Sequence, residues 1–208
     1  MSLSCIELRD LLTRTLTALP THAEELRELD AALGDGDLGI TVQSGSAAVV
    51  KAIGALPETA SVSELLLASG KAFSTANPST FAALIGGGLL AASKTVTGKD
   101  AIDKADSLAI GRAVAARIIE RGKSQVGDKT VLDALVPSLD TLEATSGSAD
   151  AVLDAMIANS REQVTATASQ QSKKGRAAWV QERSIGHADP GATAYLRFLE
   201  ALRSALQA

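Results

Sequence analysis

Three carboxylates in a short glycine-rich stretch carry the first chemical signal in this sequence. Leu29–Gly39 reads Leu-Asp-Ala-Ala-Leu-Gly-Asp-Gly-Asp-Leu-Gly, so Asp30 is followed by Asp35 and Asp37, with glycines between them. Glycine lets the backbone adopt positive φ and lie close to a ligand. Acids held this close together repel one another unless a cation lies between them, and Mg²⁺ prefers such oxygen ligands together with substrate phosphates. The stretch therefore predicts a metal–phosphate site, with a solvated acidic turn as the alternative.

Three better-known motifs share letters with this sequence, and each fails on its context. Gly34-x-Gly36-x-x-Gly39 has the spacing of a dinucleotide fingerprint, but that fingerprint follows a strand, whereas a helical pattern precedes it here. An EF-hand loop that began at Asp35 would need a glutamate at the position of Ser46. Gly122-Lys123-Ser124 resembles the end of a phosphate loop, but Arg117 stands where its first glycine is required.

The periodicity of the apolar residues places the acids between two helices. Leucines recur at helical spacing from Ile6 to Leu19, and Pro20 breaks that helix. Thr21-x-x-Glu24 predicts a capping box for a second helix, which has Asp30 near its end and stops at Gly34. A third helix is expected to begin near Gly39, and the free amides at its N-terminus would favour an anion beside the acids.

The rest of the chain has the pattern of further helices joined by short turns. Their predicted starts are the Ser61-x-x-Glu64 capping box, the Asn77-Pro78 turn, Asp100, Asp128 as a cap before Lys129, and Asp189-Pro190. Gly86-Gly87-Gly88 lies in an apolar segment and indicates close helix packing or a kink. Strand-like alternation is not visible, so we expect a single all-α domain over residues 1–208.

Composition and charge exclude several classes of protein. Hydrophobic residues make up 46% of the chain and aromatic residues only 2%, which favours closely packed aliphatic helices. The net charge of −4 gives no reason to expect nucleic acid or an anionic membrane as a partner. A single cysteine, Cys5, excludes an intrachain disulfide framework, and neither a secretory signal nor an apolar run of about 18 residues is visible. We therefore expect a soluble cytoplasmic protein.

A basic segment near the C-terminus is the second region with chemical promise. Between Lys173 and Gly191 the chain gathers Lys173, Lys174, Arg176, Arg183 and His187 in an otherwise acidic protein. The guanidinium fork of arginine matches phosphate oxygens, and lysine adds a point charge. A solvated basic loop is the alternative. Trp179, the one tryptophan, is expected to anchor the segment by packing.

Taken together, these stretches resemble the nucleotide-binding L subunit of dihydroxyacetone kinases, also called the DAK phosphatase domain. The resemblance extends over essentially the whole chain. It rests on Leu29-Asp30 with Gly34–Gly39, on Gly127-Asp-Lys-Thr-Val-Leu-Asp133, and on Lys173–Arg176 continuing through Glu182–Thr193. It implies an up-and-down antiparallel barrel of about eight helices, with the nucleotide–metal site at one end.

The resemblance also implies roles for individual residues. Asp30, Asp35 and Asp37 would hold Mg²⁺, two ions in that family, which bridges to the phosphates of ADP or ATP. Arg176 would offset phosphate charge and would close the site together with Asp189-Pro190-Gly191. The other residues implied to line the nucleotide are Leu38, Gly39, Ile40, Thr41, Ser79, Thr80, Gly122 and Val131.

The sequence departs from the family pattern in two places beside the implied nucleotide. Leu38 stands where histidine is common, and Thr41 stands where asparagine is frequent. Asn77–Phe81 replaces a glycine-rich loop, so fewer free amides would face the phosphates, although the hydroxyls of Ser79 and Thr80 could substitute for them.

The implied function is that of a kinase subunit. It would transfer a phosphoryl group to dihydroxyacetone or a similar short ketose held by a separate sugar-binding K subunit. The donor is left open between ATP as substrate and a resident ADP recharged by a phosphotransferase-system M subunit. Two alternatives stay open: an ADP-bound regulatory module that docks on a partner without turnover, and a metal-dependent phosphohydrolase, for which no dedicated general base is visible.

Overall fold

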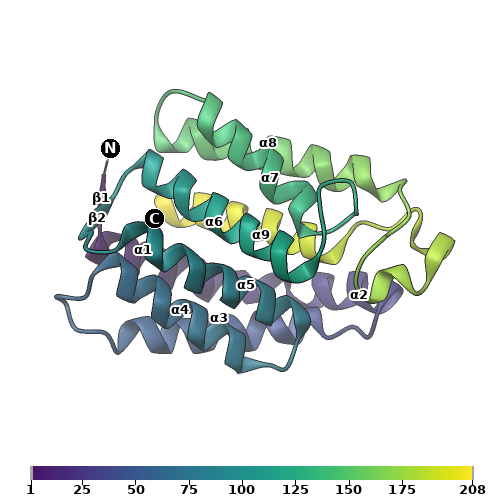
Figure 1. Ribbon diagram of the computed structural model, residues 1–208, viewed down its shortest axis with the longest axis horizontal. Helices are drawn as coiled ribbons and strands as arrows, with labels where there is room; N and C mark the ends of the chain where they lie inside the picture. The colour runs from purple at the N-terminus through teal and green to yellow at the C-terminus, as the bar shows by residue number, and fades with distance from the viewer. Residues whose placement is uncertain (1, 208) are drawn as a thin grey trace.

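Nine α-helices carry most of residues 2–207, the part of the chain that the computed structural model describes (Figure 1). Their bounds are α1 Cys5–Ala18, α2 Ala23–Leu33, α3 Leu38–Gly54, α4 Val62–Ala76, α5 Thr80–Ala92, α6 Lys104–Gly122, α7 Val131–Ala144, α8 Ala149–Ala168 and α9 Pro190–Gln207. The short 3-10 helices are η1 Leu19–His22, η2 Ser93–Val96, η3 Arg176–Ala178 and η4 Gln181–Ser184. Two short strands, β1 Leu3–Ser4 and β2 Ala101–Ile102, pair antiparallel.

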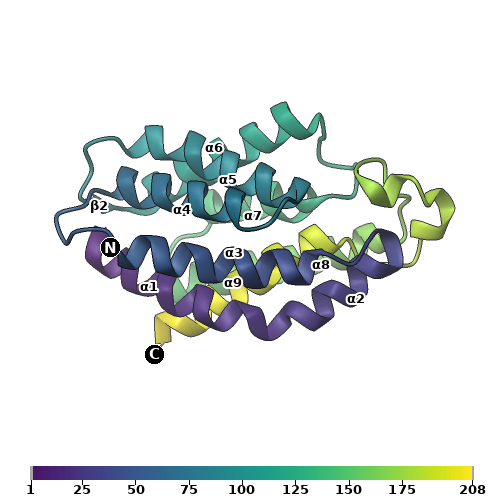
Figure 2. The same cartoon turned by 90° about the horizontal axis from the view of Figure 1, so that it is seen from below.

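The helices close into a ring. Each packs against the next in the order α1, α3, α4, α5, α6, α7, α8 and α9, and α9 packs back against α1. Neighbours in this ring run in opposite directions along the long axis of the molecule (Figure 2). Helix α2 continues from α1 through η1 and packs on α3. The expected all-α barrel of about eight helices is therefore confirmed.

Aliphatic side chains fill the barrel, as the shortage of aromatic residues requires. Leu26, Leu65 and Leu132 are completely buried, and Ile118 is 1% exposed. Burial of such a side chain stabilises a fold by about 1.5–3 kcal/mol. The core forms three clusters, which all contact Phe81 and together take residues from all nine helices.

Glycines bring α4, α5 and α6 into close contact. A Cβ atom added at Gly86 would lie 2.6 Å from the Gly70 carbonyl oxygen of α4, and one added at Gly88 would lie 2.9 Å from a methyl group of Val114 in α6. Real Cβ atoms do not approach other atoms so closely. The close packing predicted for the Gly86–Gly88 stretch is therefore confirmed.

Several predicted helix ends are confirmed, but the Thr21 capping box is wrong. Ser61 and Glu64 form the expected box at α4, and Gly34 ends α2 as predicted. Thr21 instead lies in η1, where its hydroxyl donates to the Ala18 carbonyl oxygen at 2.8 Å. Because η1 already continues the helical path from α1, the backbone at Thr21 lacks the extended conformation of an N-cap.

The starts of α6 and α7 also differ from their predictions. Helix α6 begins at Lys104, since Ala101–Ile102 pairs with β1 and Asp103 supplies the cap. Helix α7 is capped by Thr130, and Asp128 accepts a hydrogen bond from the Gln125 amide at 3.0 Å in the preceding turn. Within residues 2–207, the helices are all too short or too polar to cross a bilayer.

Candidate nucleotide and metal site

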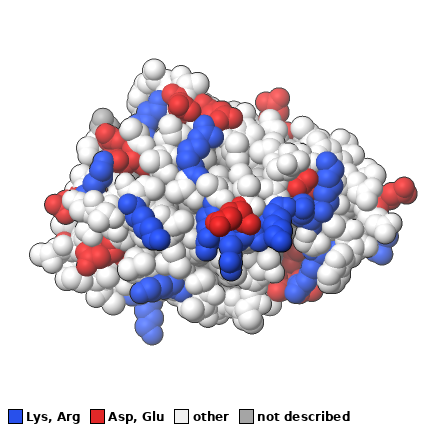
Figure 3. All heavy atoms as spheres, in the orientation of Figure 1, with Lys and Arg blue, Asp and Glu red and all other residues white. Residues whose placement is uncertain are grey.

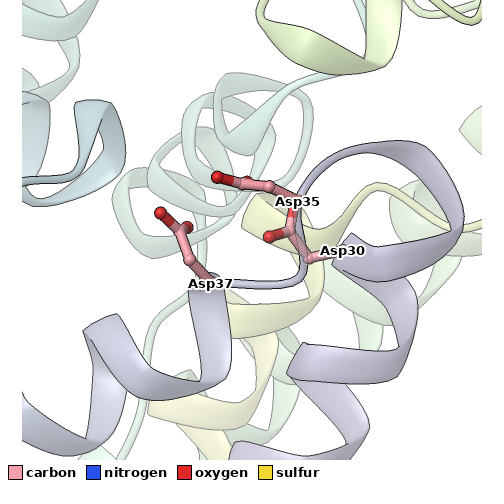
Figure 4. A group of neighbouring side chains, drawn as sticks. All are labelled: Asp30, Asp35 and Asp37. Carbon is pink, nitrogen blue, oxygen red and sulfur yellow. The ribbon is translucent and has the colours of Figure 1, made fainter.

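Asp30, Asp35 and Asp37 converge where α2 turns into α3 (Figure 4). Asp30 lies in the last turn of α2, Asp35 in the connecting loop, and Asp37 directly before α3. One carboxylate oxygen from each residue lies within 4.8 Å of those from the other two. The turn depends on glycine, because Gly36 has a φ of 72°, which L side chains rarely adopt.

The local structure orients one of these acids and raises the pKa of another. The Leu38 amide donates to Asp30 Oδ2 at 3.1 Å, which fixes the Asp30 carboxylate beside the first turn of α3. Burial raises the pKa of the Asp37 carboxyl, and the negative charge of Asp30 raises it further. A cation placed among the three carboxylates would oppose both effects. The donor set therefore fits a hard divalent cation such as Mg²⁺.

Arg176 supplies positive charge to the same cluster from a distant part of the sequence. Its guanidinium forms an ion pair with Asp35 and lies 3.7 Å from Asp37. A Cβ atom added at Gly34 would lie 3.6 Å from the Cβ atom of Arg176. The backbone around Arg176 therefore also lies directly over the turn. The structure thus brings together the two regions that the sequence singled out.

The first turn of α3 contains four of the predicted nucleotide residues. Ile40 is 57% exposed beside the acids, whereas Leu38, Gly39 and Thr41 are buried. A Cβ at Gly39 would collide with the Ala23 carbonyl oxygen, so this glycine sets the contact between α2 and α3. Of these four residues, Ile40 therefore has the one exposed side chain.

Thr41 connects α3 to the Asn77–Phe81 turn at the start of α5. Its Oγ1 accepts a hydrogen bond from Asn77 Nδ2 at 2.6 Å. Two residues later, Ser79 is the N-cap residue of α5, although its side chain makes no capping hydrogen bond within the described chain. This hydroxyl is therefore free to meet a ligand.

Thr80 lies at the start of α5 and lines a hollow of about 310 Å³ between α5 and α6, together with Ala83, Leu84, Gly87, Arg117 and Arg121. Figure 3 shows Lys and Arg side chains gathered on the face over these two helices. Leu84 also lies 3.6 Å from a Cβ added at Gly122, the last residue of α6. The predicted residues Thr80 and Gly122 therefore border one region.

The starts of α7 and α9 meet beside α5. A Cβ at Gly191 would lie 3.5 Å from the Val131 Cβ and 3.5 Å from the Phe81 ring. Asp189 caps α9 by accepting from the Ala192 amide at 2.7 Å, and burial raises the pKa of its carboxyl to about 7. Because neighbours in the ring alternate in direction, the N-termini of α3, α5, α7 and α9 share one end of the barrel (Figure 2). Such ends attract anions.

The segment that carries Arg176, residues 169–189 between α8 and α9, is named the Arg176 loop below; it projects at the acid end of the barrel (Figure 1). Trp179 in this loop is 81% exposed, so its predicted role as a packing anchor is wrong. Lys129 was predicted to lie inside a helix, with no role of its own. Lys129 instead has a φ of 60° and is 1% exposed. The Gly127–Asp133 motif was the signal that could have indicated a special backbone there.

Residues 32–204 match the DAK2 domain. The ADP-binding subunit DhaL of the PEP-dependent dihydroxyacetone kinase of Escherichia coli (strain K12) is 30% identical over 97% of each chain. The corresponding DhaL subunit of the PTS-dependent enzyme of Lactococcus lactis is 35% identical, over 82% of this chain and 83% of its own.

Two longer proteins are also similar. The L-erythrulose 1-kinase of Mycolicibacterium smegmatis is 33% identical over 86% of this chain, which spans only 32% of that protein. The dihydroxyacetone kinase of C. freundii, crystallised with AMP-PNP and Mg²⁺, matches with a TM-score of 0.74 and 22% identity, over 97% of this chain and 34% of its own. That likeness shows the fold. The DAK2 match and the two subunit-length relatives show that this chain belongs to the DAK2 domain family, that of the ADP-binding DhaL subunits of dihydroxyacetone kinases.

Proposed function

We propose that this chain is the nucleotide-binding subunit of a kinase for dihydroxyacetone or a similar short ketose. The observation that carries the proposal is the convergence of Asp30, Asp35 and Asp37 with Arg176 at the barrel end where four helix N-termini meet. Carboxylates for a metal, an arginine for phosphate oxygens and helix amides are the groups that phosphoryl transfer requires.

Each group has a distinct proposed role. The three acids hold Mg²⁺, two ions by the family resemblance, and bound Mg²⁺ offsets the negative charge of the phosphates during transfer. Arg176 leaves Asp35 to meet a phosphate oxygen when metal neutralises the acids. The starts of four helices line the rest of the nucleotide: Leu38–Thr41 at α3, Ser79-Thr80 at α5, Val131 at α7 and Asp189–Gly191 at α9. Gly122 borders the nucleotide from the end of α6.

The ketose is proposed to bind on a separate K subunit. In support, the E. coli and L. lactis relatives are named as ADP-binding subunits, whereas the erythrulose kinase is about three times as long as its match to this chain. The same two names favour ADP kept as a cofactor and recharged by a phosphotransferase-system M subunit. Since ADP, Mg²⁺ and that system meet inside the cell, the proposed compartment is the cytoplasm.

The first experiment uses the protein as purified. It is denatured, and released nucleotide is identified by chromatography with metal analysis alongside. We expect ADP and Mg²⁺ near stoichiometry. An empty protein that binds ATP reversibly in Mg²⁺ would instead indicate an ATP-dependent subunit, and binding of neither nucleotide would overturn the proposal.

Turnover separates the remaining alternatives. The chain is assayed with a sugar-binding K subunit, a phosphoryl donor and dihydroxyacetone or erythrulose. Formation of the ketose phosphate only when both subunits are present supports the kinase. ADP binding without turnover would favour a regulatory module, and phosphate release by the isolated chain would favour a phosphohydrolase.

A further inference from the structure

Lys129 buries a charged side chain beneath the Arg176 loop. It is 1% exposed, and its Nζ donates to three backbone carbonyl oxygens: Ala168 at 3.2 Å, Gln170 at 2.8 Å and Ser184 at 2.7 Å. These acceptors satisfy all three donors of an ammonium group. A buried charge that is fully hydrogen-bonded fixes the positions of its partners, since moving any one of them leaves a donor unpaired.

The three acceptors belong to both ends of the loop. Ala168 and Gln170 lie where the chain leaves α8, and Ser184 lies in η4, just before the return to α9. The two ends also contact each other directly: the Ser172 amide donates to Ser184 Oγ at 2.9 Å, and the Gly186 amide donates to the Ala168 carbonyl oxygen at 2.8 Å. Lys129 therefore lies at the closed base of the loop.

The turn around Lys129 holds the loop at a further point. The Lys173 amide donates to the Asp128 carbonyl oxygen at 3.0 Å, and Lys173 Nζ donates to the Gly127 carbonyl oxygen at 2.8 Å. From there the chain reaches Arg176 within three residues. The backbone of Lys129 is left-handed, a conformation that is uncommon for residues other than glycine.

We propose that Lys129 is a positioning residue that holds the Arg176 loop over the acidic cluster, and through Arg176 sets the affinity for a magnesium–nucleotide complex. This inference rests on the proposed function for the ligand, but its structural part stands on the loop contacts alone. Lys129 itself touches neither the acids nor the ligand. It acts by fixing the loop base, which limits where the Arg176 guanidinium can lie.

The test compares Lys129→Met with wild type. Methionine retains an apolar stem of similar length and removes only the charged donor. The loop contains Lys173, Lys174, Arg176 and Arg183, so limited trypsin digestion reports its opening, and the anisotropy of Trp179 fluorescence reports its mobility. We expect cleavage within the loop to become at least about tenfold faster and Trp179 anisotropy to fall, while far-UV circular dichroism still shows the helices.

Lys173→Met is the matched control. Lys173 Nζ also donates to a backbone carbonyl of this region, but through one exposed hydrogen bond. This variant removes one trypsin site without releasing the loop base, so we expect Trp179 anisotropy and cleavage at the remaining loop sites close to those of wild type. Unchanged cleavage and anisotropy in Lys129→Met would overturn the proposal.

A rescue distinguishes the ammonium from general packing. In a Cys5→Ala background, Lys129→Cys is alkylated with 2-bromoethylamine in denaturant and refolded, which restores an ammonium at nearly the original length. Return of Trp179 anisotropy to the wild-type value supports the proposal, and failure of this correctly folded product to recover would contradict it. Lys129→Gln retains an amide donor. If Lys129→Met does not fold, the same measurements are made on Lys129→Gln.

Titration with Mg²⁺ and ADP separates this proposal from the proposed function. With a loosened loop we expect at least about tenfold weaker binding of ADP in Mg²⁺ than in wild type. Equal affinity in a variant with an opened loop would overturn the link from Lys129 to the ligand. If wild type binds no ADP, the proposed function fails, whereas the digestion and anisotropy results still decide whether Lys129 holds the loop.

Discussion

The α2–α3 turn and the Arg176 loop meet at one site, but different contacts hold them. The turn places its three acids within eight consecutive residues, between two packed helices, and a single glycine with positive φ completes it. The loop has 21 residues, and its position depends on Lys129 and on hydrogen bonds that reach 39 to 55 residues along the chain. Short-range geometry thus fixes the proposed metal ligands, whereas long-range contacts fix the arginine that faces them.

The largest effect is expected in the turn. Asp35→Ala removes the most exposed of the three acids, together with its ion pair to Arg176, so the proposed metal site loses a ligand. We expect binding of ADP in Mg²⁺, measured by calorimetry, to fall by more than about 100-fold, with little change in the melting temperature. Asp140→Ala, which removes a surface acid paired with Arg112, is the control. Equal losses in both variants would contradict the metal assignment.

The next effect concerns Asp189, at the end of the Arg176 loop. Its pKa is raised to about 7 in the folded chain because the carboxyl is buried, whereas an aspartate in the unfolded chain has a pKa of about 3.9. Between these values the folded state binds the proton more tightly, so this group stabilises the fold at low pH, and its contribution falls as the pH rises from about 4 to about 7.

Asp189→Asn should remove that dependence and keep the cap, since asparagine is a good N-cap residue. The free energy of unfolding is measured in urea from pH 4 to pH 8. We expect the difference between the free energies of unfolding, wild type minus variant, to fall as the pH rises, by at most about 1.4 kcal/mol per pH unit. A difference that stays constant, or rises with pH, would contradict the raised pKa.

A pair of glycine variants tests the packing behind the acid turn. Gly39→Ala places a methyl group against the Ala23 carbonyl oxygen, so α2 and α3 must separate, and we expect a loss of about 1–3 kcal/mol in the free energy of unfolding. In Gly54→Ala the added methyl group meets no atom of the described chain within 4 Å, so a gain of up to about 1 kcal/mol is expected there. Chemical denaturation checks both values, and equal stability of the two variants would refute the close packing.

The smallest effect is also the most discriminating. Arg176→Ala removes the cation that pairs with Asp35, and with it the proposed donor to a phosphate oxygen. We expect Mg²⁺ alone to bind a few-fold tighter and ADP in Mg²⁺ to bind about tenfold weaker, which corresponds to roughly one charge-assisted hydrogen bond. A loss of affinity for both ligands would mean that Arg176 supports the turn instead of opposing the metal.

Predictions from the sequence succeeded where local residues fix the structure, as in the α2–α3 turn, and failed where distant contacts do, as in the Arg176 loop. The end of α2 at Gly34 and the start of α9 at Pro190 depend on neighbouring residues, and these predictions are confirmed. The three acids lie together in the structure, and their role as metal ligands stays a prediction. The all-α class followed from helical periodicity, and the barrel followed from the family resemblance alone. The individual nucleotide-lining residues stay predictions, although the structure places most of them at one end of the barrel.

The failed predictions required knowledge of distant contacts. Lys129 has a left-handed backbone, and the acceptors of its side chain come from another part of the chain, whereas the local sequence favoured a helix there. Trp179 was expected inside because tryptophan is large and apolar, but the loop that carries it projects from the barrel. Thr21 had the letters of a capping box, but the 3-10 turn at Pro20 kept the chain helical through that position.

The alternation of helix direction around the ring has a consequence for how this architecture can vary. A closed ring in which neighbouring helices are antiparallel needs an even number of helices. The ring of α1 and α3 to α9 has eight. Adding or losing a helical hairpin would preserve that parity and keep every second N-terminus facing the acids. Adding or losing one helix would make two neighbouring helices parallel. Some helix N-termini would then lie at the end of the barrel opposite the acids. The circumference of such a barrel can therefore change only in steps of two helices.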